Sequence, residues 1–227
     1  MSNSGGMKLV FIGDSLIDAY RVEEHACPSR RLGMGWVFLV MADLMVRFPG
    51  RPLDPVNRGI PGNRLRDVAV RWERDCLAHM PDVVTLGVGA NDTRRVLKDG
   101  DGDSVEAFEA GLLGLLERGR AAMPRTRFFV MEPFLVPTGQ ATPAHMADIE
   151  ARAGAAHRST RAAGACFVEL GAPFREKLLL APAPFWAYDG IHPTPAGHRL
   201  IADAWLSALA SEIPELGLPE ERTAGHA

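Results

Sequence analysis

Hydrophobic and polar positions divide the chain into two kinds of block that alternate along its length. Short, nearly continuous apolar runs are typical of buried strands, and they lie at Lys8–Gly13, Leu53–Asn57, Asp82–Val88, Arg127–Glu132 and Cys166–Leu170. Longer helix-like blocks lie between or after them, at Gly35–Phe48, Asn63–Ala78, Ser104–Met123, Pro143–Ala163 and Thr194–Glu212. Because strand and helix alternate, the pattern predicts an α/β fold with a central parallel sheet of about five strands, covered by helices on both faces.

Long connections join these blocks at Ala19–Gly33, Arg94–Asp103, Pro133–Pro143 and Gly171–Tyr188. The last three follow a predicted strand directly or nearly so. Parallel strands all end at one edge of the sheet, and open α/β sheets bind their ligands at that edge. We therefore expect these connections to lie around Ser15, which ends the first strand block.

The chain has neither an internal repeat nor an interdomain linker, so residues 1–227 are expected to form one domain. Residues 1–6 are polar and are expected to be a flexible N-terminus. Residues 214–227 are polar with two prolines, which predicts a loosely held C-terminal tail or an oligomer contact. The block Gly35–Phe48 is apolar over most of its length, which fits burial in the core or against another subunit. A homo-oligomer therefore remains open.

The composition narrows the function classes. A net charge of −3 and the lack of a basic stripe with interleaved aromatic residues argue against a nucleic-acid partner. No signal peptide is evident, and no run approaches the ~20 apolar residues that a membrane span needs. We expect a cytoplasmic protein with no membrane partner. The three cysteines are odd in number and widely spaced, which indicates neither a disulfide framework nor a zinc site.

Ser15 is the candidate nucleophile, since Gly-Asp-Ser breaks the first apolar run abruptly. A serine hydroxyl is a weak nucleophile until a base takes its proton. His192 is the candidate base, and Asp189 is close enough in sequence to hold the imidazole through a tight turn. Pro193 biases His192 away from the helical conformation, which leaves the imidazole on a loop.

Acyl transfer also needs hydrogen-bond donors for the oxyanion. Gly59 follows the second strand block and offers a backbone N–H at close approach. Asn91 follows the third strand block and offers its side-chain amide. With the backbone N–H of Ser15, these groups make three donors around one point.

Each segment also has a simpler interpretation. Residues 13–15 are compatible with a plain turn, residues 189–192 with a loop or helix cap, and the Asn-Asp pair at 91–92 with turn chemistry. Catalysis is favoured because all four segments end or follow predicted strands in chain order. A dinucleotide-binding turn needs a glycine where Asp92 stands, and the acidic run 99–103 lacks the glycine and glutamate of a calcium loop. No metal and no cofactor is predicted.

The four segments resemble the SGNH hydrolases, also called GDSL esterases and lipases, over nearly the whole chain. The matching blocks are Gly13-Asp14-Ser15-Leu16, Asn57-Arg58-Gly59, Gly89-Ala90-Asn91-Asp92 and Asp189-Gly190-Ile191-His192-Pro193-Thr194. The resemblance implies Ser15 as nucleophile, His192 as base and Asp189 as its orienter. It implies the Ser15 N–H, the Gly59 N–H and the Asn91 amide as the oxyanion hole. The implied fold is a flavodoxin-like three-layer α/β/α sandwich.

Residues 31–36, 57–63 and 185–192 look like the acetyl xylan esterase branch of that family. This narrower resemblance implies a small ester or acetylated oligosaccharide as substrate, and a homo-oligomer in some members. The candidate substrate-binding residues are Asp14, Tyr20, Arg58 and Trp186. Phe134, Leu135 and Val136 keep a lysophospholipase or acyl-thioesterase open as an alternative, and a non-catalytic carbohydrate- or lipid-binding module is the alternative from another class.

Overall fold

The computed structural model describes residues 6–138 and 141–218, and its centre is one parallel β-sheet. The strand order is β2-β1-β3-β4-β5, with every neighbouring pair parallel. The strands are β1 (Met7–Gly13), β2 (Leu53–Gly59), β3 (Val83–Gly87), β4 (Arg127–Met131) and β5 (Cys166–Val168). The predicted parallel sheet of about five strands is confirmed, with boundaries that differ by up to two residues.

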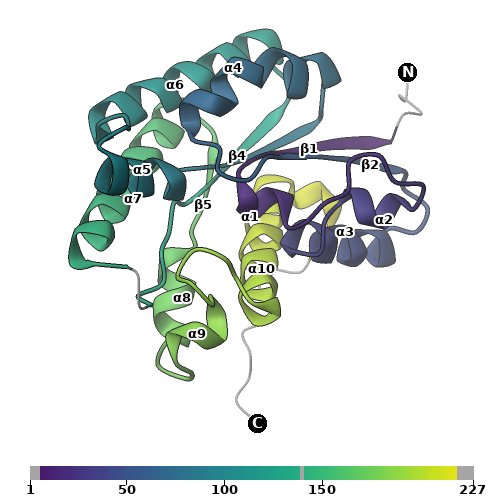
Figure 1. The fold of residues 1–227 in the computed structure, drawn as a ribbon. Helices are drawn as coiled ribbons and strands as arrows, with labels where there is room; N and C mark the ends of the chain where they lie inside the picture. The colour runs from purple at the N-terminus through teal and green to yellow at the C-terminus, as the bar shows by residue number, and fades with distance from the viewer. Residues whose placement is uncertain (1–5, 139–140, 219–227) are drawn as a thin grey trace.

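Helices cover both faces of the sheet, so the molecule has three layers (Figure 1). One face packs against α3 (Trp36–Arg47) and α10 (Pro195–Glu212). The other packs against α4 (Leu65–Asp75), α6 (Val105–Ala122) and α7 (Pro143–Ala162). Successive side chains of a strand point to opposite faces, so Leu9 and Phe11 of β1 enter one core while Val10 and Ile12 enter the other.

The register aligns the strand ends that carry the candidate site. Gly13 at the end of β1 pairs with Gly59 of β2 on one side and with Gly87 of β3 on the other. The chain goes from β1 to β2 at one neighbouring position and then crosses to β3 at the other. This reversal of direction opens a crevice at the carboxyl ends of the strands, and Ser15 lies there.

An aromatic cluster stabilises the layer beneath Ser15. Trp36 of α3 and Trp205 of α10 lie 6.3 Å apart between ring centroids, and both contact Phe11 of β1. The Trp36 indole N–H donates to the Leu16 carbonyl at 2.9 Å. The core therefore holds directly the segment that follows the candidate nucleophile.

The structure corrects the expected connections, since five further helices lie in or next to them. The connections contain α2 (Pro28–Arg31), α8 (Gly171–Lys177) and α9 (Ala183–Trp186), whereas α1 (Ser15–Asp18) directly precedes one and α5 (Ala90–Asp99) overlaps another. Most of the segment expected as a connection at Arg94–Asp103 belongs to α5, which ends at Gly100 in a left-handed conformation (φ 63°). α5 has few apolar residues, and its first turn is held by buried polar ones, so the hydrophobic pattern did not indicate it. The other four helices are short enough that few apolar positions mark them.

The expected C-terminal tail also needs correction where it begins. Pro214–Leu216 form a 3₁₀ helix, and Leu216 is buried in the core. Burial of the apolar Leu216 side chain is favourable, so this part of the chain packs against the core instead of remaining loose. Residues 219–227 of that tail, like residues 1–5 of the expected flexible N-terminus, lie outside the described residues.

Helix α3 places Trp36, Val37, Val40, Met41 and Leu44 in the core. Burial against the sheet therefore explains why these positions of the block Gly35–Phe48 are apolar. Within the described residues, no helix combines the length and apolar character needed to cross a lipid bilayer.

Candidate active site

Ser15 is the first residue of α1, at the point where β1 ends. The Asp14 carboxylate caps this helix by accepting the Leu16 N–H at 2.9 Å. A side chain on Gly13 would place its Cβ 2.0 Å from the Gly87 carbonyl oxygen, so only glycine fits there. The tight Gly-Asp-Ser turn thus follows from close packing between neighbouring strand ends, and it presents the hydroxyl at the sheet edge.

Ser15, His192 and Asp189 form a continuous hydrogen-bonded chain. Ser15 Oγ lies 2.9 Å from His192 Nε2, and His192 Nδ1 lies 2.7 Å from Asp189 Oδ2. The tautomer with its proton on Nδ1 donates to the carboxylate and leaves Nε2 free to accept the hydroxyl proton. The structure therefore brings together three residues that the sequence analysis singled out, across 177 positions of chain.

A tight turn fixes the relation between Asp189 and His192. Asp189 Oδ1 accepts the backbone N–H groups of Ile191 and His192 at 3.0 and 2.8 Å. Gly190 has a φ of 92°, which glycine adopts without strain. The helix α10 starts only after Thr194, its N-cap, so the imidazole is on the loop as expected.

The hydrogen bonds of this turn favour a charged Asp189. Burial by itself raises the pKa of a carboxyl group. The backbone N–H and the ring of His192, with the Ile191 N–H, outweigh that effect and hold the pKa of Asp189 below its ordinary value. Asp189 is therefore a carboxylate beside the imidazole at neutral pH.

The three expected oxyanion donors lie at the ends of β1, β2 and β3, but two of them already have acceptors. The Gly59 N–H donates to Asn57 Oδ1 at 2.9 Å. The Asn91 amide donates to Asp14 Oδ2 and to the Asn63 carbonyl, both at 3.2 Å. An oxyanion would have to share or exchange these contacts.

Asp14 is one of those competing acceptors, and its protonation state affects the competition. Its side chain is almost fully buried. Burial raises the pKa of Asp14 to about 7, against the lowering effect of the Leu16 N–H. A neutral carboxyl group holds the Asn91 amide less strongly than a carboxylate does, so the protonated form leaves that amide more available.

Sequence reasoning did not identify Asn57 and Arg71, which shape the site from within. Asn57 Nδ2 donates to the Ile17 and Leu32 carbonyls at 2.7 and 2.8 Å, which fixes α1 against β2. Its place at the end of the second strand block, next to the candidate donor Gly59, was the signal available for Asn57. Arg71, on the buried side of α4, resembles any other charged helix residue in the sequence.

The Arg71 guanidinium connects three segments of the site. It donates to the Gly13 carbonyl at 2.9 Å, to the Arg58 carbonyl at 2.8 Å and to Asn63 Oδ1 at 2.9 Å. The Arg58–Gly59 peptide is trans, so holding its carbonyl oxygen also fixes the direction of the Gly59 N–H. Arg71 therefore controls the geometry of one expected donor without contacting the reacting atoms.

The remaining substrate-binding candidates differ in their surroundings. Tyr20 is highly exposed, on the chain just after α1. Arg58 forms an ion pair with Glu23 at 2.6 Å and lines a groove of about 680 Å³ beside β2. Trp186 packs partly against the core, and its indole N–H donates to the Ala181 carbonyl at 3.2 Å.

A small cavity is lined by sequence neighbours of Ser15 and His192, although neither of those two residues lines it. Its volume is about 20 Å³, which is room for one water-sized or methyl-sized group. It is lined by Asp14 and Leu16, which flank Ser15, and by Ile191, which precedes His192. Val88, Met131 and Phe134 make its wall mainly apolar. Within the described ranges, 6–138 and 141–218, no three His, Cys, Asp or Glu side chains gather into a group that could hold a metal ion.

Comparison of the sequence with protein families matches residues 11–200 to the GDSL-like lipase/acylhydrolase family. The acetylxylan esterase of Geobacillus stearothermophilus is 31% identical over 219 residues, which cover 93% of this chain and 98% of that enzyme. The family match extends across all four segments that carry the candidate site.

Solved structures have the same arrangement of elements. A candidate GDSL-like lipase from Parabacteroides merdae superimposes with a TM-score of 0.86 at 29% identity, covering 94% of this chain and 96% of that one. An α/β hydrolase from the metagenome of Lake Arreo gives 0.81 at 30% identity, covering 90% and 96%. The crystal structure of the Geobacillus acetylxylan esterase gives 0.81 at 28% identity, covering 98% and 100%.

Proposed function

The chain belongs to the GDSL-like lipase/acylhydrolase family and is a carboxylic ester hydrolase, and from this premise we propose that it removes acetyl groups from carbohydrates through a Ser15-His192-Asp189 acyl-enzyme mechanism. The observation that carries the mechanism is the unbroken chain from Ser15 Oγ through His192 to Asp189. Two solved structures of the Geobacillus enzyme are catalytic mutants, one of a serine and one of an aspartate, which supports the same residue types here.

In the first half-reaction, Ser15 Oγ attacks the ester carbonyl while its proton passes to His192 Nε2. The carbonyl π electrons move to the oxygen, which accepts hydrogen bonds from the N–H groups of Ser15 and Gly59 and from the Asn91 amide. One such donor is worth roughly 10²–10³ in turnover. When the oxyanion collapses, the bond to the alcohol oxygen breaks and the departing alcohol takes the proton from His192.

In the second half-reaction, His192 removes a proton from water and the resulting hydroxyl attacks the acyl-Ser15 ester. The second oxyanion collapses, Ser15 Oγ leaves and regains the proton from His192, and the carboxylic acid is released. Asp189 stays ionised throughout and stabilises the imidazolium that forms in each half.

The acetyl preference is supported by the cavity that Asp14 and Leu16 line on either side of Ser15 in the sequence, because about 20 Å³ is room for a methyl-sized group. Two of the residues that suggested a long apolar groove are instead in the core: Phe134 stacks on Phe174 at 4.7 Å between ring centroids, and Val136 is buried. This placement disfavours a lysophospholipase or acyl-thioesterase.

The carbohydrate part of the proposal draws on the relatives. The Geobacillus enzyme is an acetylxylan esterase and is also described as an acetyl-xylooligosaccharide esterase. The sugar that carries the acetyl ester would have to occupy the open side of the site, opposite the small cavity.

A panel of esters tests both parts of the proposal. The parent protein is expected to hydrolyse acetylated methyl β-xyloside, and to prefer nitrophenyl acetate over the octanoate. Ser15→Ala is expected to lose hydrolysis while retaining its thermal unfolding temperature. Unchanged hydrolysis by Ser15→Ala would refute the nucleophile, a maximum at octanoate would refute the acetyl preference, and a folded parent inactive on every ester would favour a binding module.

A further inference from the structure

The chain contains only two tyrosines, and each is within five residues of Ser15 or His192 in the sequence. Tyr188 directly precedes Asp189, and Tyr20 follows the helix α1 that Ser15 begins. Tyr20 is 72% exposed and Tyr188 is 54% exposed. Large aromatic surfaces left in water at the entrance of a site are available for a ligand to cover.

The Tyr188 ring extends the imidazole of His192 outward. The two rings are nearly parallel, with an interplanar angle of 16° and centroids 5.7 Å apart. The Tyr188 N–H donates to the His192 carbonyl at 3.1 Å, and Ala187 forms a β-bridge with Pro193. These contacts tie the position of the tyrosine to the turn that holds the base.

The backbone that carries Tyr20 is held in a strained conformation. Ala19 and Tyr20 are both left-handed, with φ values of 41° and 62°, an arrangement that costs a side-chain-bearing residue energy. The Tyr20 N–H donates to Asp18 Oδ2 at 3.0 Å, and the Met34 N–H donates to the Ala19 carbonyl at 2.7 Å. Strain sustained by such contacts is often found at functional sites.

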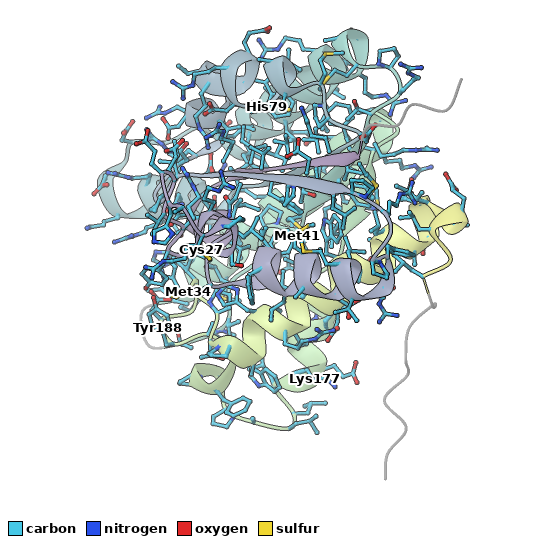
Figure 2. The ribbon with its side chains drawn as sticks, turned by 90° about the vertical axis from the view of Figure 1, so that its right-hand side faces the viewer. Cys27, Met34, Met41, His79, Lys177 and Tyr188 are labelled. Carbon is cyan, nitrogen blue, oxygen red and sulfur yellow. The ribbon has the colours of Figure 1, made fainter. Side chains whose placement is uncertain are left out.

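The pKa of Tyr188 indicates that the Tyr20 hydroxyl lies near its own. Hydrogen bonding with Tyr20, then burial, raises the pKa of Tyr188 to about 12. Met34, itself 73% exposed, lies at the same edge of the molecule as Tyr188 in Figure 2. The entrance is therefore bordered by aromatic rings whose hydroxyl groups remain available as polar partners.

The chemistry of the proposed reaction places the alcohol part of the ester on this side. His192 Nε2 must return a proton to the departing alcohol oxygen, so that oxygen lies within hydrogen-bond distance of the imidazole. The acyl part is confined by the cavity of about 20 Å³. The alcohol then extends past the imidazole, and the exposed ring of Tyr188 is an aromatic surface that lies beside that imidazole.

We propose that Tyr188, supported by Tyr20, forms the subsite for the sugar ring that bears the acetyl group. The C–H face of a pyranose would lie on the Tyr188 ring, and the tyrosine hydroxyls would contact the sugar hydroxyls. This inference rests on the proposed carbohydrate esterase function and deepens it. It also moves the sugar-facing role from Trp186, which is packed partly in the core, to Tyr188.

The test compares two acetate esters that differ only in the alcohol. Ethyl acetate has no ring to stack, whereas acetylated methyl β-xyloside has one. Tyr188→Ala is expected to lower kcat/KM for the xyloside at least tenfold, mainly through a higher KM, and to leave ethyl acetate within about twofold. Tyr188→Phe is expected to keep most of the xyloside activity, because it retains the ring.

Phe185→Ala is the matched control. Phe185 is also 54% exposed and lies three residues from Tyr188, but its ring contacts Trp186 rather than His192. Phe185→Ala is expected to change kcat/KM for neither ester. Thermal unfolding temperatures would verify that each variant is folded. An equal loss on both esters in Tyr188→Ala would overturn the subsite and make Tyr188 a residue that positions His192. No loss on either ester would overturn it as well.

A binding measurement separates the subsite from the proposed function. The probe is unacetylated methyl β-xyloside, observed by saturation-transfer NMR with the parent protein and with Tyr188→Ala. Transfer to the sugar that disappears in the variant is the expected result, and its absence in the parent overturns the subsite. A parent that hydrolyses ethyl acetate but not the acetylated xyloside would instead refute the carbohydrate function.

Discussion

Asp189 uses each of its oxygens for a different task. Oδ1 accepts two backbone N–H groups that form the turn, and Oδ2 faces His192 Nδ1. An asparagine with its oxygen toward the backbone would keep the turn but turn an N–H toward the imidazole. The ring would then have to place its own proton on Nε2, where it could not accept the Ser15 proton.

Asp189→Asn is therefore expected to fold normally and to lose turnover by about 10⁴-fold, as in triads of this type. Steady-state kinetics on nitrophenyl acetate and a thermal melt measure the two effects. A loss smaller than tenfold would mean that another group orients the imidazole.

His198 is a second residue whose charge matters, through stability rather than catalysis. The Nδ1 atom of His198 accepts a hydrogen bond from the backbone N–H of Trp36 at 3.2 Å. Burial, then the nearby His192, lowers the pKa of His198 from 6.5 to about 4. Between those two pH values the unfolded chain binds a proton that the folded chain does not, so stability must fall as the pH decreases through this window.

The fall attributable to His198 is at most about 3 kcal/mol. His198→Asn keeps an acceptor for the Trp36 N–H but does not titrate. Urea unfolding at pH 7 and at pH 4.5 is expected to show a smaller decrease in unfolding free energy for the variant than for the parent. Equal decreases in both proteins would contradict the assignment.

At the scale of elements, α4 contributes to the site through Arg71 alone. The planar guanidinium reaches two strand-end carbonyls and Asn63 at once, and also Asp75 at 3.0 Å. A lysine has one ammonium group and cannot reproduce this fork. The peptide that carries the Gly59 N–H would lose the group that orients it.

Arg71→Lys is expected to lower the unfolding free energy by about 1–3 kcal/mol. It is also expected to lower kcat while changing KM little. Arg74→Lys is the matched control, since Arg74 is on the same helix and pairs with the same Asp75 but is 75% exposed. Kinetics and denaturant melts on both variants give the comparison. A similar effect of the two changes would show that only the charge pairing matters.

The elements with strong hydrophobic patterns could be predicted from sequence, and those held by polar contacts could not. All five strands and the five long helices have apolar faces, and the structure contains them within a few residues of their expected positions. The helix α5 begins with buried Asn91, Asp92 and Thr93, and Asp92 accepts the Leu65 N–H at the start of α4. Such a contact depends on a partner 27 residues away, which a local pattern does not contain.

The same distinction applies to the site. The segment containing Ser15 and the turn of Asp189 and His192 were recognisable because the chemistry needs those residue types in that order. The competing acceptors, Asn57 and Asp14, were not recognised in this role, because their effect depends on where neighbouring strand ends come to lie. Tyr188 gave no signal of its own until its ring was found beside the imidazole.

At the scale of the whole molecule, the small cavity lined by Asp14 and Leu16 is built by several elements at once. Phe134, on the connection after β4, forms part of its wall and stacks on Phe174 of α8. The proposed acyl-chain limit would therefore be a property of packing between the sheet and the α8 region, rather than of the residues that react.

Phe134→Ala is expected to enlarge this cavity and to raise butyrate activity relative to acetate by at least tenfold. The same change is expected to cost about 3–5 kcal/mol of stability, because a buried aromatic side chain is removed. Nitrophenyl esters of increasing chain length and a urea melt measure both. An unchanged chain-length profile in a folded variant would locate the limit elsewhere.

The close contact between β2 and α1 has a consequence for how this enzyme can diversify. A Cβ on Gly59 would lie 2.1 Å from the Asp18 backbone nitrogen, whereas Ser15 and His192 are only partly buried. In a library sorted first for cellular abundance and then for activity, variants of Ser15 and His192 would survive the first sort and be lost in the second. Variants of Gly59 would already be lost in the first. A homologue that has lost catalysis can therefore have other residues in place of the serine and histidine, but it is expected to keep the glycine, because the fold requires it.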